Sequence, residues 1–324
     1  MKICFLDRTE FRYDSSSLHS YKLRGAESIL INLSKALSVI GNDITIINNC
    51  PNPSIKNNIR WININSKFNI ENFDLVISNG DCNLFNLVKS KKKILFSHSI
   101  QSIEKFIRKK QLISYLKHKP KICFLSNYHK KNRSKLLYLF GNINLKWSVD
   151  EIFLESKILD KIDNNLAIFT SRPDRNLKLL IDIWNNYIYP RNKSLKLSIT
   201  ENTFKHNSNS IFERKFTNQK NLLTDLSNSR IFLIPGHKAE LFCLAAEEAR
   251  ELCLPIVTLG IGSLSERVLH EKTGFIAKNL KEFSDYTINL FEDDNLWNKM
   301  RSNLIKNRGI RNWNDVAKDL LSQI

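Results

Sequence analysis

Short apolar runs alternate with amphipathic stretches along most of the chain. The runs with the length and composition of buried strands lie at residues 2–7, 44–47, 75–78, 94–97, 122–126, 166–170, 195–200, 231–234 and 256–259. Several are followed by segments whose apolar residues recur every three or four positions, as on one face of a helix. Strands that alternate with helices are typical of a doubly wound sheet. The pattern therefore predicts an α/β protein.

The stretch 231–274 gives the clearest strand-helix-strand pattern. Its first apolar run ends at Pro235-Gly236, and a helix is predicted from Glu240 until Pro255 stops it. A second strand and a glycine-rich loop follow. In open parallel sheets, the loops at the carboxyl ends of the strands bind ligands. We therefore expect ligand chemistry within this stretch.

Two carboxylates of the predicted helix suggest which chemistry this is. Glu240 and Glu248 are eight residues apart, so they can face one side of a helix about 12 Å from each other. This span suits a nucleotide sugar: one carboxylate holds hydroxyls of the sugar, the other holds the ribose, and free amides at the helix start face the diphosphate. An ordinary amphipathic helix with solvated acids gives the same spacing. The pair alone leaves both interpretations open.

Two arginines follow another predicted strand. The strand at 166–170 leads into Ser171-Arg172-Pro-Asp-Arg175 and then into a helix that reaches Trp184. Fixed cations at such a place stabilise the charge that grows on a departing diphosphate. We favour this role over a plain surface loop, and Lys178 is a further cationic candidate.

The N-terminal half offers two single-residue candidates. Gly25 opens a predicted helix over residues 25–40, where it lets the backbone approach a diphosphate or an acceptor, unless it is a plain loop glycine. His98 follows the strand at 94–97, where a lone histidine is either a structural hydrogen-bond partner or a functional residue.

The stretch 231–274 resembles the nucleotide-binding half of bacterial-type GT-B glycosyltransferases of family 4, the glycosyl transferases group 1. That family's pattern runs from a strand through Pro-Ser, E-x-F-G and a second Glu before Ala to G-x-P-V-V, a glycine-rich turn with Glu, and T-G. The matching positions are Pro235, Glu240, Phe242, Glu248, Ala249, Pro255, Gly262, Glu266, Thr273 and Gly274. Cys243 and Cys253 stand where the family has Gly, and the side chain of Cys243 could crowd the donor sugar.

The resemblance extends more loosely to other parts of the chain. Arg172 and Arg175 match two basic residues that grip the donor diphosphate in the family, while Asn176 replaces a Gly. Near the N-terminus only Gly25 of a Gly-Gly pair is present, and Asn42 stands in a His position.

The resemblance implies a GT-B fold, with two Rossmann-like doubly wound domains facing a cleft. The implied domains are an acceptor-side domain at 1–150, a nucleotide-sugar-binding domain at 151–307 and a C-terminal helix at 308–324 that returns to the first domain. The segment 147–165 is the expected linker, and Trp313 the expected packing anchor of the last helix.

The implied reaction is retaining transfer of a hexosyl group from a UDP- or GDP-sugar to a glycan, lipid-linked or other acceptor in cell-surface polysaccharide synthesis. No carboxylate is placed as a nucleophile, so the resemblance suggests a same-face displacement assisted by the leaving phosphate. No cofactor and no metal are expected, because the arginines and helix amides replace the cation and a D-x-D motif is missing.

The resemblance assigns a role to each candidate. The implied catalytic residues are Glu240, His98, Arg172 and Arg175, and His98 is expected to contact the donor sugar or to relay a proton. The implied donor-binding residues are Gly25, Arg172, Arg175, Lys178, Glu240, Phe242, Cys243, Leu244, Glu248 and Glu266. Among them, Glu240 is expected to hold the sugar hydroxyls and Glu248 the ribose.

Charge changes the picture for one segment. The chain of 324 residues has a net charge of +18. The segment from Lys89 to Lys146 contains 16 basic residues and a single acidic one, Glu104, so its net charge is 16 − 1 = +15. Apolar residues within this segment have the spacing of one helix, with basic residues on its other side: Ile103, Phe106, Ile107, Ile113 and Leu116 against Lys105, Arg108, Lys109 and Lys117. Such a helix fits an anionic membrane surface. A solvated face is the alternative, and nucleic acid is the less favoured partner because no nucleic-acid-binding motif accompanies the charge.

Composition limits the remaining classes. A hydrophobic fraction of 42% over this length allows two domains with proper cores. No signal peptide or run of 18 apolar residues is visible, so we expect a cytoplasmic protein, with peripheral attachment to the inner membrane face as an option. Six cysteines without C-x2-C spacing predict buried free thiols. A GT-B epimerase or phosphorylase and a non-catalytic basic protein are the alternatives. The retained glutamate and arginine pairs argue against the non-catalytic protein.

Overall fold

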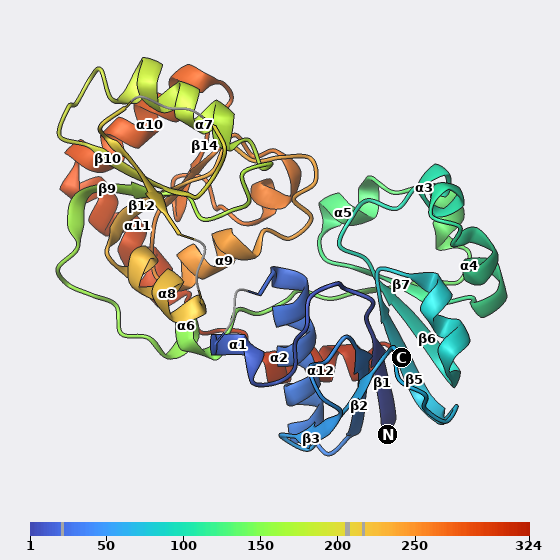
Figure 1. Ribbon diagram of the computed structural model, residues 1–324. Coiled ribbons are helices and arrows are strands. Elements are labelled where there is room, and N and C mark those ends of the chain that lie inside the picture. The colour runs from blue at the N-terminus through green and yellow to red at the C-terminus, as the bar shows by residue number, and fades with distance from the viewer. Residues whose placement is uncertain (21–22, 205–207, 216–217) are drawn as a thin grey trace. The chain divides into compact units, whose positions relative to one another are not determined.

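The computed structural model describes residues 1–20, 23–204, 208–215 and 218–324. The chain divides into two compact units, which are drawn in Figure 1. Unit 1 consists of Met1–Ser148 together with Trp313–Ile324, and unit 2 of Val149–Asn312. These boundaries differ by two to five residues from those expected from the sequence, which were 150/151 and 307/308.

Unit 1 contains an eight-stranded sheet. Its strands are β1 (Lys2–Leu6), β2 (Asp43–Asn48), β3 (Ser54–Lys56), β4 (Ile59–Asn63), β5 (Asn72–Asn79), β6 (Lys89–Phe96), β7 (Lys121–Phe124) and β8 (Asn142–Asn144). They lie in the order β3-β4-β2-β1-β5-β6-β7-β8. All neighbours are parallel except β3, which runs antiparallel to β4. Buried Ile, Leu, Val and Phe residues of the central strands form the core.

The helices of unit 1 include one contributed by the end of the chain. They are α1 (Ser17–Ser20), α2 (Gly25–Val39), η1 (Cys82–Leu87), α3 (Ile103–Arg108), α4 (Leu112–His118), α5 (Asn127–Lys131), η2 (Lys135–Tyr138) and α12 (Trp313–Ser322). The C-terminal helix α12, drawn in red, packs against α2 (Figure 1). Trp313 is 4% exposed, and its ring centroid lies 6.0 Å from that of Trp147.

Unit 2 contains a six-stranded, fully parallel sheet. Its strands are β9 (Asp163–Ile168), β10 (Lys196–Thr200), β11 (Ile211–Arg214), β12 (Ser229–Leu233), β13 (Ile256–Thr258) and β14 (Gly274–Ile276). They lie in the order β11-β10-β9-β12-β13-β14, so the chain winds outward in both directions from the β9–β12 pair. In such a sheet, ligands bind at the carboxyl ends of the strands where the winding direction reverses.

Helices connect these strands. They are α6 (Glu151–Glu155), α7 (Leu177–Ile183), the π-helical turn η3 (Trp184–Ile188), α8 (Gln219–Ser227), α9 (Leu244–Glu251), η4 (Gly262–Glu266), α10 (Leu280–Glu292) and α11 (Asp294–Lys306). Their apolar faces join the sheet in one core cluster, with Trp184 and Phe283 fully buried.

The α/β class and the nine predicted strands are confirmed. Three expectations are wrong. The helix expected from Glu240 begins at Leu244, because Cys243 before it has a left-handed backbone (φ 62°). The single basic helix expected around 103–116 is two helices, α3 and α4, since Lys110 between them is also left-handed (φ 53°). The expected linker 147–165 holds α6 and the start of β9.

All six cysteines are free and buried, as predicted from their spacing. Within the described ranges, every helix is too short or too polar to cross a bilayer.

We predict that Trp313→Ala destabilises unit 1. Trp313 is buried where α12 packs in unit 1, and replacing a buried tryptophan by alanine typically lowers the free energy of unfolding by about 3 to 5 kcal/mol. Ile113→Ala is the control, because Ile113 lies in the same unit and is 82% exposed. Urea unfolding curves of both variants test this, and equal midpoints would contradict the packing of α12 described above.

Candidate active site

The predicted phosphate and sugar residues of unit 2 gather where β9 and β12 end. These strands are neighbours, so the loops that follow them leave the same edge of the sheet side by side. The loop after β9 carries Ser171 to Asn176, and the loop after β12 carries Pro235 to Cys243. Asn176 joins the two loops, because its side-chain amide donates a hydrogen bond of 2.5 Å to the carbonyl of Gly236.

Glu240 is the centre of this polar group. Its side chain is almost buried, and its Oε1 accepts a hydrogen bond from Ser171 Oγ (3.0 Å) and lies 3.3 Å from Arg175 Nε. Burial raises the pKa of Glu240, while Arg175 and Ser171 act in the opposite direction. The structure therefore brings together the predicted sugar-holding carboxylate and one predicted phosphate-binding arginine.

The backbone of the Glu240 loop is fixed by a close contact with Gly262. The carbonyl of Glu240 accepts a hydrogen bond from the amide of Ser263 (2.9 Å). A Cβ on Gly262 would lie 2.8 Å from that carbonyl oxygen and 2.4 Å from the carbonyl oxygen of His237. Gly262, whose φ is 78°, is thus needed here for close backbone approach.

The two arginines differ in their surroundings. Arg175 is 16% exposed and bridges Glu240 and Asp174, with Nη1 2.7 Å from the aspartate. Arg172 is 66% exposed and pairs with the same Asp174 at 2.8 Å. Asp174 therefore holds both guanidinium groups near each other, and a diphosphate could replace it as their common anionic partner.

Helix α9 begins beside this group. Cys243 occupies its N-cap position, and its carbonyl accepts hydrogen bonds from the amides of Ala246 (3.2 Å) and Glu247 (3.3 Å). The two amides that precede Ala246 in the first turn are the ones that have no carbonyl partner inside the helix. Phe242 is buried beneath the guanidinium of Arg267, whose carbon lies 4.6 Å from the ring centroid. Leu244 is half-buried.

Two further predicted donor-binding residues of unit 2 lie at the surface. Lys178 is exposed in α7, and Glu266 is exposed at the end of η4.

The charged neighbours of Glu248 are Asp150 and Arg214, and not the residues around Glu240. Glu248 lies on α9 and is 6% exposed, and burial together with nearby Asp150 raises its pKa to about 8, against a smaller opposing effect of Arg214. Because Glu240 precedes the helix, the two glutamates do not share one helical face, and the expectation of a 12 Å helical spacing is wrong.

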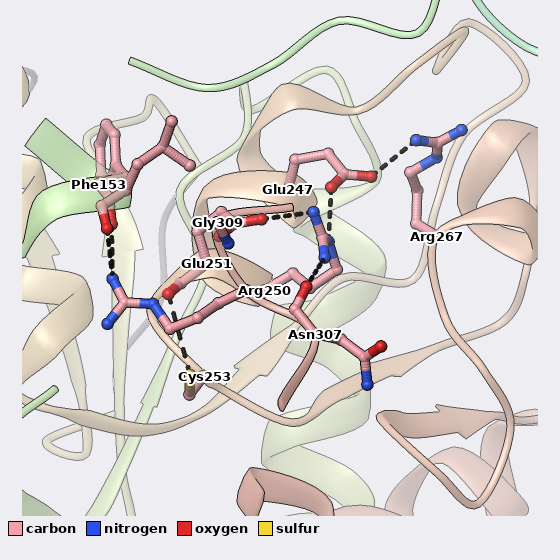
Figure 2. A network of polar contacts seen from close by, with 10 residues as sticks. Phe153, Glu247, Arg250, Glu251, Cys253, Arg267, Asn307 and Gly309 are labelled. Carbon is pink, nitrogen blue, oxygen red and sulfur yellow. Dashed lines mark hydrogen bonds and ion pairs between the residues drawn. The ribbon is translucent and has the colours of Figure 1, made fainter. Parts of the chain in front are cut away.

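Another glutamate of α9, Glu247, for which the sequence pattern gave no prediction, fixes the helix in unit 2 (Figure 2). Glu247 accepts from Arg250 (2.6 Å) and Arg267 (2.7 Å), and these arginines lower its pKa although burial alone would raise it. Glu251 accepts from the backbone amide of Gly309 at 2.7 Å. The only sequence signal for this network is the spacing of Glu247 and Arg250, an i, i+3 pair.

The two candidates of the N-terminal half lie in unit 1, whereas all others lie in unit 2. Gly25 is the exposed first residue of α2. His98 follows β6, and its Nε2 lies 2.6 Å from Asn79 Oδ1. Burial lowers the pKa of His98 to about 4, so the ring is neutral near pH 7 and serves as a hydrogen-bonding group.

A buried acidic group near β1 was also missed. Asp7 accepts a hydrogen bond of 2.5 Å from the Tyr13 hydroxyl, and Glu27 accepts one of 3.1 Å from Thr9. Both carboxylates are less than 5% exposed, and burial raises the pKa of each. An acidic residue directly after the first apolar run was the available signal.

Residues 173–308 match the family described as glycosyl transferases group 1. The matched region contains Arg175, Glu240 and Glu248. No curated protein sequence matches the chain significantly.

The chain shares its fold with several solved structures. The chain is similar to Anabaena Alr3699/HepE in complex with UDP and glucose (12% identity, TM-score 0.70, covering 100% of this chain and 99% of that one). It is also similar to a glycosyltransferase from Rickettsia africae ESF-5 (15%, TM-score 0.70, covering 99% and 97%). A third similar protein is TarM of S. aureus (14% identity, TM-score 0.59). The match covers 76% of this chain but only 54% of the TarM chain.

The chain therefore has the GT-B fold, and its residues 173–308 match the glycosyl transferases group 1, in agreement with the resemblance seen in its motifs. No group of three or more His, Cys, Asp or Glu residues able to hold a metal ion occurs in the described part of the chain.

We predict that Glu248→Gln changes the pH dependence of stability. Native Glu248 keeps its proton up to about pH 8, whereas an unfolded glutamate loses it near 4.5, so wild-type stability falls as pH rises between these values. The variant lacks this loss, and its free energy of unfolding should gain about 4 kcal/mol over wild type between roughly pH 5 and 9. Chemical denaturation at both pH values measures this. Parallel pH profiles would contradict the assignment, and the exposed Glu292→Gln is the control.

Proposed function

We propose that this protein transfers a hexosyl group from a UDP- or GDP-sugar to a glycan, lipid-linked or other acceptor, with retention of anomeric configuration. The observation that carries the proposal is the group of Ser171, Arg175 and Glu240 at the carboxyl ends of β9 and β12. The similar Anabaena protein forms a complex with UDP and glucose, which supports a nucleotide-sugar donor for this chain as well. Cell-surface polysaccharide synthesis is the process we favour.

In the proposed reaction, Glu240 accepts hydrogen bonds from hydroxyls of the donor sugar. Arg175 and Arg172 neutralise the diphosphate, and the first amides of α9 add partial positive charge. The bond between the sugar's anomeric carbon and the phosphate oxygen breaks as the acceptor oxygen bonds to the same face. The acceptor's proton passes to the departing phosphate oxygen, so no protein nucleophile is needed.

We also propose roles for Glu248 and for the arginines as substitutes for a metal ion. Glu248 holds the ribose hydroxyls, which favours its ionised form because a carboxylate is the stronger acceptor. The arginines supply the positive charge that a metal ion would otherwise provide, so we propose a metal-independent transfer that requires no cofactor.

We further propose that unit 1 attaches to the inner face of an anionic membrane. Ile107, Ile113 and Leu116 of α3 and α4 are 58%, 82% and 45% exposed. Exposed basic residues of the same two helices accompany them, including Arg108 and Lys117. Apolar side chains that insert at the headgroup boundary, together with nearby cations, favour such a surface.

We predict that one nucleoside diphosphate stabilises the protein against heat and that Glu248→Ala loses this effect. At 100 times its dissociation constant a ligand adds about 2.7 kcal/mol to the free energy of unfolding. The panel is UDP, GDP, ADP and CMP with their sugars, measured by differential scanning fluorimetry. Glu292→Ala, an exposed carboxylate of α10, is the control and should keep the shift. If no nucleotide shifts the wild type, the enzyme proposal fails.

We predict that Ile113→Ala with Leu116→Ala weakens binding to phosphatidylglycerol vesicles by roughly tenfold, because two inserted side chains are lost. The control is Ile55→Ala with Ile70→Ala, since these residues are 74% and 65% exposed in unit 1 outside the basic segment. Vesicle co-sedimentation measures the binding. Equal losses in both pairs would argue against α3 and α4 as the attachment surface.

A further inference from the structure

Unit 1 contains a polar hollow of about 290 Å³, counting its open mouth. It lies where β5 and β6 end, next to α3. Its lining residues are Gly80, Leu95, Ser97, Ser99, Gln101, Lys105, Phe106, Lys109 and Gln111. The roles proposed above for unit 2 use none of them.

The charge of the hollow is positive. Lys105 and Lys109 lie one turn apart at the end of α3 and both line it. Lys105 Nζ donates to Ser99 Oγ, and burial, followed by the nearby Lys109 and Arg108, lowers the pKa of Lys105. Among the described lining residues none is acidic, so the hollow itself supplies no counter-charge.

A buried amide of the hollow is without a partner. Gln101 is 1% exposed, and its Nε2 donates no hydrogen bond within the described chain. Burying a hydrogen-bond donor without an acceptor costs free energy, so such a group is expected to have a partner outside the protein, such as a water molecule or an ion.

His129 fixes which end of this amide is unpaired. His129 Nδ1 accepts a hydrogen bond from the Leu125 amide (3.4 Å), so its Nε2 carries the proton and donates to Gln101 Oε1 (3.0 Å). Burial lowers the pKa of His129 to about 3, which keeps the ring neutral in this tautomer. The Gln101 amide nitrogen is therefore the end that remains to donate to a ligand.

The hollow thus combines two ammonium groups, an unpaired amide donor and the hydroxyl of Ser99. Two lysines match the charge of a phosphate group, and phosphate oxygens accept the hydrogen bonds that the amide and hydroxyl offer. We propose that this hollow binds a phosphate group, and that this group belongs to the acceptor substrate. The phosphate site stands on the hollow alone, whereas its role in acceptor binding rests on the glycosyl transfer proposed above.

The test is isothermal titration of the protein with inorganic phosphate in the presence of saturating UDP, which occupies the donor diphosphate site. Lys105→Met with Lys109→Met removes both charges and should weaken phosphate binding by about tenfold or more. The control is Lys91→Met with Lys92→Met, an equal charge change at exposed residues near the start of β6, which should leave phosphate affinity unchanged. Equal losses in both pairs, or no binding to the wild type, would overturn the proposal.

A second variant tests the amide directly. Gln101→Glu keeps the shape and an acceptor for His129 but turns the unpaired donor into a carboxylate oxygen, so phosphate binding should be lost. Unchanged phosphate affinity in this variant would overturn the proposal. The UDP affinity of each variant shows that the protein is folded, and it reports on the donor site independently of the hollow.

Further titrations identify the ligand class and its source. Acetate binding as tight as phosphate binding would overturn the phosphate assignment. Glycerol 3-phosphate and vesicles of phosphatidylcholine with phosphatidic acid then separate a water-soluble phosphate from a lipid headgroup. Tighter binding of either one that depends on Lys105 and Lys109 supports the site and names its source. If UDP fails to bind while phosphate binds through the lysines, the donor proposal fails and the phosphate site stands.

Discussion

The parallel pairing of β9 with β12 is the constraint on which the candidate site depends. It brings two loops that are about sixty residues apart in the sequence, near Arg175 and near Glu240, to one edge of the sheet. The ion pair between these residues and the hydrogen bond from Asn176 to Gly236 then tie the loops together. Charged groups fixed in this way before a ligand binds are what the proposed stabilisation of a departing diphosphate requires.

Three residues that replace glycines of the family motifs keep the backbone conformation of glycine. Cys243, Cys253 and Asn176 stand where the resembled family has glycine, and all three have φ between 61° and 64°. Glycine adopts this left-handed conformation at little cost, whereas asparagine and especially cysteine strain the backbone there. The fold therefore keeps the left-handed backbone conformation at these positions although none of them is a glycine. The strain at Cys243 sits at the start of α9, beside the proposed sugar site.

Elements with a strong local sequence signal could be predicted from the sequence. Elements whose position depends on tertiary contacts could not. Apolar runs located the central strands, and motif order singled out Arg175 and Glu240, whose side chains lie 3.3 Å apart in the structure. Short or polar strands such as β3, β8 and β11 gave no clear period because their stability comes from their neighbours. The start of α9 was missed because a cysteine in a left-handed conformation is rare, so nothing local marked a boundary. The partners of Glu247 were also hidden, because Arg267 reaches it from a different segment.

The most direct test of the central claim is the affinity of the donor nucleotide for Arg175→Ala, measured by calorimetry with the nucleoside diphosphate that best stabilises the wild type. Arg191→Ala is the matched control, because Arg191 pairs with Asp285 at the surface of the same unit. Loss of a charge-assisted contact to phosphate should weaken binding by about tenfold or more in Arg175→Ala and leave the control unchanged. Equal affinities for both variants and the wild type would contradict the placement of the diphosphate between β9 and β12.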